Sequence, residues 1–151
     1  MINYTRTNSD NKDFQNLVKE LDEDLKIRDG EDHAFYAQFN KTDKIKYAIV
    51  AYENEIPVGC GAIREYSGDT MEVKRMYVIP GKRGQGIASA ILKLLVQWTM
   101  ELNFRKCILE TGTNQPEAIA IYTKNGFKII PNFGQYEKME HSVCFEKVIK
   151  A

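Results

Sequence analysis

Apolar and polar residues follow a helical rhythm and then a strand rhythm along the N-terminal half of the chain. After a short strand expected over Ile2–Thr5, apolar side chains recur about every 3.6 residues, which predicts an amphipathic helix. Ser9-Asp10 can cap this helix and Asp29-Gly30 ends it. A second, shorter helix is expected over 33–39. The apolar stripe of the first helix consists of Phe14, Leu17, Val18, Leu21 and Leu25.

Three runs typical of β-strands follow this helical region. They cover Tyr47–Tyr52, Val58–Tyr66 and Met71–Ile79, and clusters of turn residues separate them. Because such short connections join strands that run in opposite directions, the runs predict an antiparallel meander of three strands.

The C-terminal half alternates helices with strands. Gly84-Gln85-Gly86 opens a long helix, and a strand is expected over Lys106–Thr111. Pro116–Lys124 reads as a further helix, because proline is favoured at the first helical position. Phe127–Ile130 and Ser142–Val148 are expected to pair as a final hairpin. The apolar face of the long helix consists of Ile87, Ile91, Leu94, Leu95, Trp98 and Leu102.

The resulting order is β-α-α-β-β-β-α-β-α-β-β, which predicts an α/β (α+β) fold. The helices would flank a mixed, mostly antiparallel central sheet. A strand–helix–strand crossover in the middle of this order requires at least one parallel pair of neighbours. The length of 151 residues fits a single domain over 1–151.

Charge and cysteine content exclude several classes of protein. The 21 basic residues balance 21 acidic ones, so no net charge draws the chain to nucleic acid or to an anionic membrane. No apolar run reaches the roughly 20 residues of a bilayer span, and the N-terminus does not resemble a signal peptide. Cys60, Cys107 and Cys144 are odd in number and far apart, and no residues are spaced as metal ligands. We therefore expect buried thiols, no metal and a cytoplasmic location.

The segment that joins the third strand of the meander to the long helix carries the most chemical information. Gly81, Gly84 and Gly86 allow the backbone to turn with positive φ and to approach a ligand closely. The free N–H groups and the dipole of a helix N-terminus favour phosphate, and Lys82 and Arg83 add positive charge. A glycine-rich turn with solvated basic residues would account for the pattern equally well. The spacing fits neither a P-loop nor a dinucleotide-binding fingerprint.

Three motifs in this half resemble those of the GNAT (Gcn5-related) N-acetyltransferase superfamily. Arg83-Gly84-Gln85-Gly86-Ile87-Ala88 resembles its Gln/Arg-x-x-Gly-x-Gly/Ala motif, and Lys74–Pro80 and Glu117–Phe127 also resemble GNAT sequence. The order of elements matches over nearly the whole chain. The resemblance implies an acetyl-CoA-dependent enzyme that moves an acetyl group to a primary amine of a small molecule or peptide by direct attack on the thioester.

The resemblance also implies where acetyl-CoA binds. Its pyrophosphate would rest on the backbone amides of Gln85 to Ala88, with Arg83 nearby. Its pantetheine arm would pair with Met76 and Val78, and a Val78 N–H would stabilise the oxyanion. These groups are accessible if the third meander strand splays from the next parallel strand. Gln115 stands where the family commonly has an asparagine that contacts CoA, and the longer side chain carries the same amide.

Two residues are candidates for catalysis by the same resemblance. Glu72 falls where many GNAT enzymes carry a glutamate that acts as general base, directly or through water. A salt bridge with Lys74, two residues further along the strand, is the alternative. Tyr122 falls where the family often places a tyrosine near the sulfur of CoA, as general acid or thiolate stabiliser. A tyrosine of the core is the alternative there.

The acceptor pocket is less defined by sequence. Phe35, Tyr36, Glu72 and Tyr136 are candidates to line it, although packing against the core would equally explain the first two. The identity of the amine and the oligomeric state stay open, a homodimer included. A different class of function also stays open, namely a catalytically silent acyl-CoA-binding module that senses or regulates.

Overall fold

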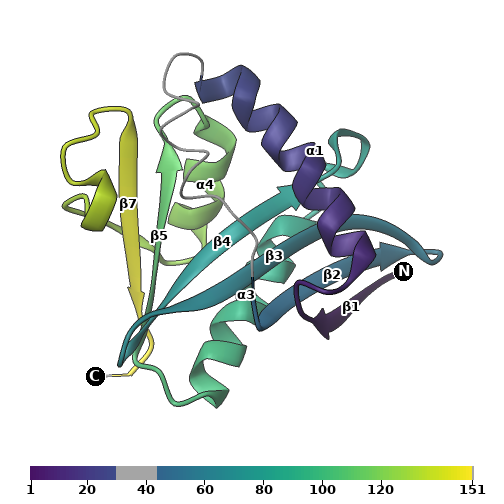
Figure 1. The fold of residues 1–151 in the computed structure, drawn as a ribbon, viewed down its shortest axis with the longest axis horizontal. Helices are drawn as coiled ribbons and strands as arrows, with labels where there is room; N and C mark the ends of the chain where they lie inside the picture. Colours follow the sequence, from purple (N-terminus) through teal and green to yellow (C-terminus); the bar gives the residue numbers. More distant parts are fainter. Residues whose placement is uncertain (30–43, 151) are drawn as a thin grey trace.

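A seven-stranded mixed sheet forms the frame of the computed structural model, which describes residues 1–29 and 44–150 (Figure 1). The strands are β1 (Ile2–Thr7), β2 (Tyr47–Glu53), β3 (Ile56–Ser67), β4 (Thr70–Val78), β5 (Lys106–Gly112), β6 (Lys128–Ile130) and β7 (Ser142–Val148). Their spatial order is β1-β2-β3-β4-β5-β7-β6. Only β4 and β5 are parallel neighbours, as the crossover between them requires. The predicted mixed sheet, the antiparallel meander and the terminal β6–β7 pair are confirmed.

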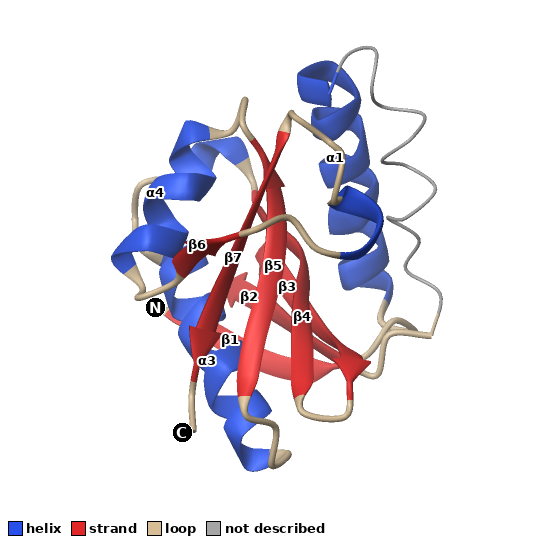
Figure 2. Cartoon of the chain, turned by 90° about the vertical axis from the view of Figure 1, so that its left-hand side faces the viewer, coloured by secondary structure: helices blue, strands red, loops and turns tan. Residues whose placement is uncertain are grey.

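The helices cover both faces of this sheet (Figure 2). On one face lies α1 (Lys12–Asp29), and on the other lie α3 (Ile87–Glu101) and α4 (Pro116–Lys124). Two short 3-10 helices, η2 (Pro80–Lys82) and η3 (Gly134–Tyr136), were not expected from the sequence. The helix predicted over 33–39 lies outside the described residues.

The start of α1 differs from the predicted one. The side-chain oxygen of Asn11 accepts the N–H of Phe14 at 2.9 Å, so Asn11 caps the helix rather than Ser9-Asp10. The N–H of Ser9 instead donates to the carbonyl of Ile45, which precedes β2. A contact between distant segments thus selects one cap among several residues that could each have served.

The core of the molecule lies on both sides of the sheet. Phe14, Leu17, Val18 and Leu21 of α1 pack on one face, as their spacing predicted. On the other face the buried side of α3 is turned slightly from the predicted stripe, since Leu92 is buried while Trp98 is only half-buried. Together α1 and α3 hold the middle of the sheet between them.

The strands β4 and β5 separate soon after they begin (Figure 1). They pair only over Thr70–Glu72 and Lys106–Ile108, so the remainder of β4 has no partner strand on that side within the described sheet. This confirms the predicted splay. The opening lies between α1 on one face and α4 on the other.

Candidate active site

The open edge of β4 presents main-chain groups toward the gap. The N–H of Ile79 donates to the carbonyl of Val58 at 3.0 Å, and the preceding residue, Val78, stands opposite Gly59. Because successive residues of an antiparallel strand direct their N–H and C=O to opposite sides, those of Val78 point away from β3. The Nε of Arg83 donates to the Val78 carbonyl at 2.8 Å. The Val78 N–H therefore faces the gap.

A β-bulge in β4 shapes the same edge. Between Cys60 and Ala62 of β3 the register shifts, so that Arg75 and Met76 together oppose Gly61. Arg75 has a φ of 62°, in the left-handed region. A Cβ on Gly61 would lie 2.6 Å from the Met76 sulfur, which explains why this position is a glycine. The bulge thus allows Met76 and the backbone after it to turn toward the gap.

A large cavity of about 500 Å³ lies between this edge, the N-terminus of α3 and the side of α4. Gly84 and Gly86 have φ values of 79° and 84°, as a turn into the helix requires. The N–H of Ala90 is the first to bond back to the carbonyl of Gly86, so the earlier amides of α3 have no intrahelical acceptor. The volume of this large cavity is that of a typical small-molecule site. Predicted cofactor residues in its lining are Met76, Val78, Arg83, Gly84, Gly86, Ile87, Ala88, Gln115 and Tyr122.

Two of the cationic side chains at this cavity, Lys82 and Arg83, are held by protein partners. Lys82 forms an ion pair with Glu53, and Arg83 lies 3.9 Å from Asp24. The guanidinium of Arg83 also lies over the Tyr77 ring, 5.5 Å from its centroid. Arg83 therefore stabilises the turn after β4, and the free amides of α3, together with the exposed Lys124 of α4, are available to an anion. Gln85 is exposed and does not line the cavity.

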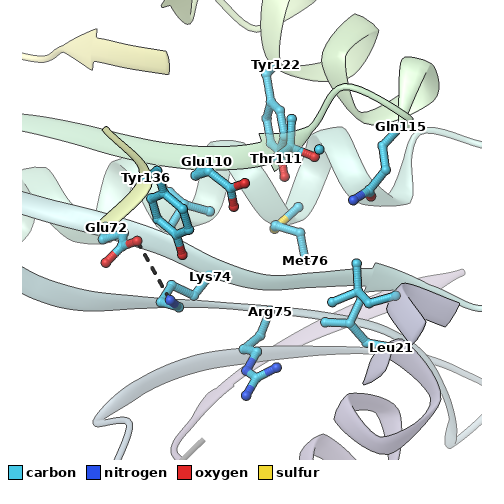
Figure 3. A pocket seen from close by; sticks show the side chains of 13 residues that line it. Leu21, Glu72, Lys74, Arg75, Met76, Glu110, Thr111, Gln115, Tyr122 and Tyr136 are labelled. Atoms are coloured by element: carbon cyan, nitrogen blue, oxygen red, sulfur yellow. Dashed lines mark ion pairs between the residues drawn. The ribbon is translucent and has the colours of Figure 1, made fainter. Parts of the chain in front are cut away.

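A smaller cavity of about 90 Å³ adjoins the large one (Figure 3). It lies between β4, β5 and the end of α1, and η3 contributes Tyr136 to its wall. The residues that line both cavities are Leu21, Met76, Gln115 and Tyr122. A molecule in the large cavity can therefore meet a molecule in the small one beside Met76 and Tyr122.

Glu72 and Lys74 form a buried ion pair in the small cavity. Their charged groups lie 3.7 Å apart, and the two residues are only 6% and 8% exposed. Burial raises the pKa of the Glu72 carboxyl, although the positive charges of Lys74 and Arg64 oppose this effect. Burial lowers the pKa of the Lys74 ammonium. The salt bridge named as the alternative for Glu72 is present, and the same carboxylate lines the cavity.

Tyr122 points from α4 toward β4 at the junction of the two cavities (Figure 3). Its ring is buried against Phe127 and Phe145, with centroids 6.1 and 5.9 Å away. Burial, and secondarily the negative charge of Glu110, raise the pKa of its phenol. The hydroxyl is therefore protonated at neutral pH and can donate a hydrogen bond or a proton. Tyr122 is both a core residue and a wall of the site, so the two alternatives do not exclude each other.

The structure adds two charged residues that the sequence analysis missed: the buried Arg75, which pairs with Asp22 at 3.0 Å, and Glu110. Glu110 of β5 lines the small cavity together with the predicted Tyr136. An acidic residue directly after the apolar run Cys107–Leu109 was a signal that could have identified it. The other two acceptor candidates, Phe35 and Tyr36, lie outside the described residues.

The cysteines are buried and free, as predicted. Burial raises the pKa of the Cys60 thiol to about 12 and those of Cys107 and Cys144 to about 11. They are thiols at neutral pH, which makes them poor nucleophiles. Across residues 1–29 and 44–150, no His, Cys, Asp and Glu side chains gather as a metal site, and no helix is long and apolar enough to span a bilayer.

Comparison with known proteins identifies a family profile and related sequences that match this chain. The profile of the acetyltransferase (GNAT) family matches residues 11–127. The uncharacterized N-acetyltransferase YjgM of Escherichia coli is 38% identical over 87 residues, 56% of this chain and 52% of that protein. The IAA acetyltransferase of Azospirillum brasilense is 37% identical over 100 residues, 66% of this chain and 65% of that protein. The matches thus span between half and two thirds of these two relatives.

Solved structures share the fold over almost the whole chain. A protein from Klebsiella pneumoniae, provisionally described as an acyl-CoA N-acyltransferase, superposes with a TM-score of 0.81 at 27% identity, covering 98% of this chain and 97% of that one. The PaiA N-acetyltransferase of Thermoplasma acidophilum, solved in complex with coenzyme A, superposes with a TM-score of 0.73 at 16% identity, covering 99% of each chain. The arrangement of sheet and helices is therefore one that such proteins have.

Proposed function

Because the chain belongs to the acetyltransferase (GNAT) family, we propose that it moves the acetyl group of acetyl-CoA to a primary amine by direct attack on the thioester. The observation that carries this proposal is the meeting of two cavities beside Met76 and Tyr122. The large cavity has the volume for acetyl-CoA and free backbone N–H groups that can bind it. The small cavity is lined by the carboxylates of Glu72 and Glu110, which can interact with an amine.

The main chain around the large cavity is suited to acetyl-CoA. The free amides at the start of α3 would bind the pyrophosphate, because a helix N-terminus attracts anions. The outward groups of Met76 and the carbonyl of Val78, which can accept a second hydrogen bond beside that of Arg83, would pair with the amides of the pantetheine arm, as a peptide does when it extends a sheet. Gln115, in the walls of both cavities, offers its side-chain amide to the same arm.

Acetyl transfer needs a neutral amine, a stabilised oxyanion and a leaving thiolate. In the proposed reaction Glu72 accepts a proton from the acceptor ammonium, through water, and the neutral nitrogen attacks the thioester carbon. The N–H of Val78 donates to the oxygen that becomes negative. As the new C–N bond replaces the C–S bond, Tyr122 protonates the departing sulfur, and the nitrogen passes its second proton through water to the Tyr122 phenolate. Glu72 then releases the first proton to solvent.

Thiol release from acetyl-CoA tests this function. The purified protein is incubated with acetyl-CoA and a library of small primary amines and peptides, and free CoA is measured against a no-acceptor blank. We expect amine-dependent release, and mass spectrometry should find the acetylated amine. If acetyl-CoA binds by calorimetry but no amine in the library releases thiol, the silent acyl-CoA-binding module becomes the better explanation.

A further inference from the structure

Two carboxylates lie on the same face of the sheet where β4 and β5 begin to separate. Glu72 stands opposite Ile108 in the last pair that joins these strands. Two residues further along each strand, Lys74 and Glu110 project on the same face as Glu72, because side chains alternate with a period of two. Glu110 therefore lies in the splayed part of the gap, whereas Glu72 lies at its closed end.

Glu110 and Glu72 also differ in how strongly they affect the pKa values of the two nearby tyrosines. Glu110 raises the pKa of the Tyr122 phenol, whereas Glu72 is not among the groups that shift it. Both carboxylates raise the pKa of Tyr136, with Glu110 the stronger of the two. The strand register and the effect on Tyr122 agree that Glu110, rather than Glu72, is the carboxylate closer to the junction with the large cavity, where the acetyl group would lie.

The small cavity already accommodates one ammonium group. The Lys74 ammonium pairs with Glu72, and although burial, the largest effect, lowers its pKa, the charges of Glu72 and Glu110 oppose that shift. In Figure 3 the Glu110 carboxylate, the Tyr136 hydroxyl and the Lys74 ammonium point into the same space. The carboxylate and phenol oxygens can accept hydrogen bonds from a further ammonium group, and hydrogen bonds that involve charged partners are stronger than neutral ones.

On this basis, and resting on the proposed function, we infer that the acceptor binds as an ammonium ion against Glu110. The substrate class is then an aliphatic primary amine that is protonated at neutral pH, and Glu110 is the residue that selects it. Glu72, at the closed end, remains the group that takes the proton once the ammonium is in place. Binding and deprotonation are thereby assigned to two different carboxylates.

A charged probe and its neutral counterpart test the inference directly. Butylamine is a cation at pH 7, and 1-butanol has nearly the same shape without the charge. Each is titrated by NMR into the CoA-loaded protein as wild type, Glu110→Gln and Glu146→Gln. Glu146 is the matched control, since it lies on β7 and pairs with Lys106 outside both cavities. Melting temperatures of the three proteins verify that each is folded.

We expect the wild type to bind butylamine more tightly than 1-butanol. Glu110→Gln should weaken the binding of butylamine roughly 10- to 100-fold, which corresponds to the loss of a hydrogen bond to a charged group. The affinity for 1-butanol should not change. Glu146→Gln should change neither affinity. Equal loss of both probes in Glu110→Gln, no preference for butylamine in the wild type, or no binding of either probe would overturn the inference.

The thiol-release screen separates this inference from the proposed function. If the protein acetylates only amines that are uncharged at pH 7, such as arylamines, the proposed function stands and the role of Glu110 is wrong. If no amine is acetylated, the proposed function fails, while a charge-selective site at Glu110 is still measured by the titration.

Discussion

Replacing Gly86 by alanine tests whether backbone amides bind the cofactor. Gly86 precedes α3 with a φ of 84°, a conformation that residues with a Cβ rarely adopt. A Cβ built there has no atom within 4 Å, so the change strains the backbone without a steric clash. Gly81 provides a matched control, because it also has open space around its Cβ position and does not have a positive φ.

The expected magnitude follows from this geometry. Holding an L-residue in the left-handed region costs about 1–2 kcal/mol, which for a chain of this size lowers the melting temperature by roughly 2–8 °C. If the backbone instead relaxes, the first amides of α3 no longer point into the large cavity. Loss of one such hydrogen bond to a charged phosphate weakens the binding of acetyl-CoA about tenfold or more.

Calorimetry of acetyl-CoA binding and thermal melts of Gly86→Ala, Gly81→Ala and Arg83→Ala provide the measurement. We expect Gly86→Ala to lose the most affinity and Gly81→Ala to behave as wild type. Arg83→Ala should fall between them, because its guanidinium is already engaged by the Val78 carbonyl and the Tyr77 ring. Equal acetyl-CoA affinity in Gly86→Ala and Gly81→Ala would refute the amide site.

Three further substitutions test the catalytic groups and the bulge. Tyr122→Phe should lower turnover about 10²–10⁴-fold with acetyl-CoA affinity unchanged, and unaltered turnover under rate-limiting chemistry would make the residue purely structural. Glu72→Gln should lower kcat/KM for the amine. Because burial raises the pKa of Glu72, the activity of the wild type should rise with pH over a range above the usual pKa of a glutamate. Glu72→Gln should lack this rise. An identical pH profile in both proteins would contradict the role of Glu72 as base. Gly61→Ala should destabilise the fold by about 1–3 kcal/mol, because its Cβ would lie 2.6 Å from the Met76 sulfur. Gly68→Ala is the control, since a Cβ at Gly68 has open space around it and should not destabilise the fold. Equal melting temperatures of the two variants would contradict the packing at the bulge.

Much of the fold follows from patterns between near neighbours in the sequence. The bounds of α4 and β7 agree with the predicted ones, and α3 begins directly after the predicted glycine turn. Helical and strand periodicity act over a few residues, so a single sequence contains them. The motif around Gly86 likewise led to the large cavity, because a turn and a helix N-terminus are local structures.

The small cavity depended on contacts that no local pattern encodes. Glu110 was missed because its place beside Lys74 follows from the register of β4 and β5, two strands that a long helix separates in the chain. The bulge at Arg75, which redirects Met76, arises where β3 and β4 lose register. The sequence by itself determined the elements and the loop that suits a phosphate. Only tertiary packing decided which charged side chains meet, because register and splay depend on segments that are distant along the chain.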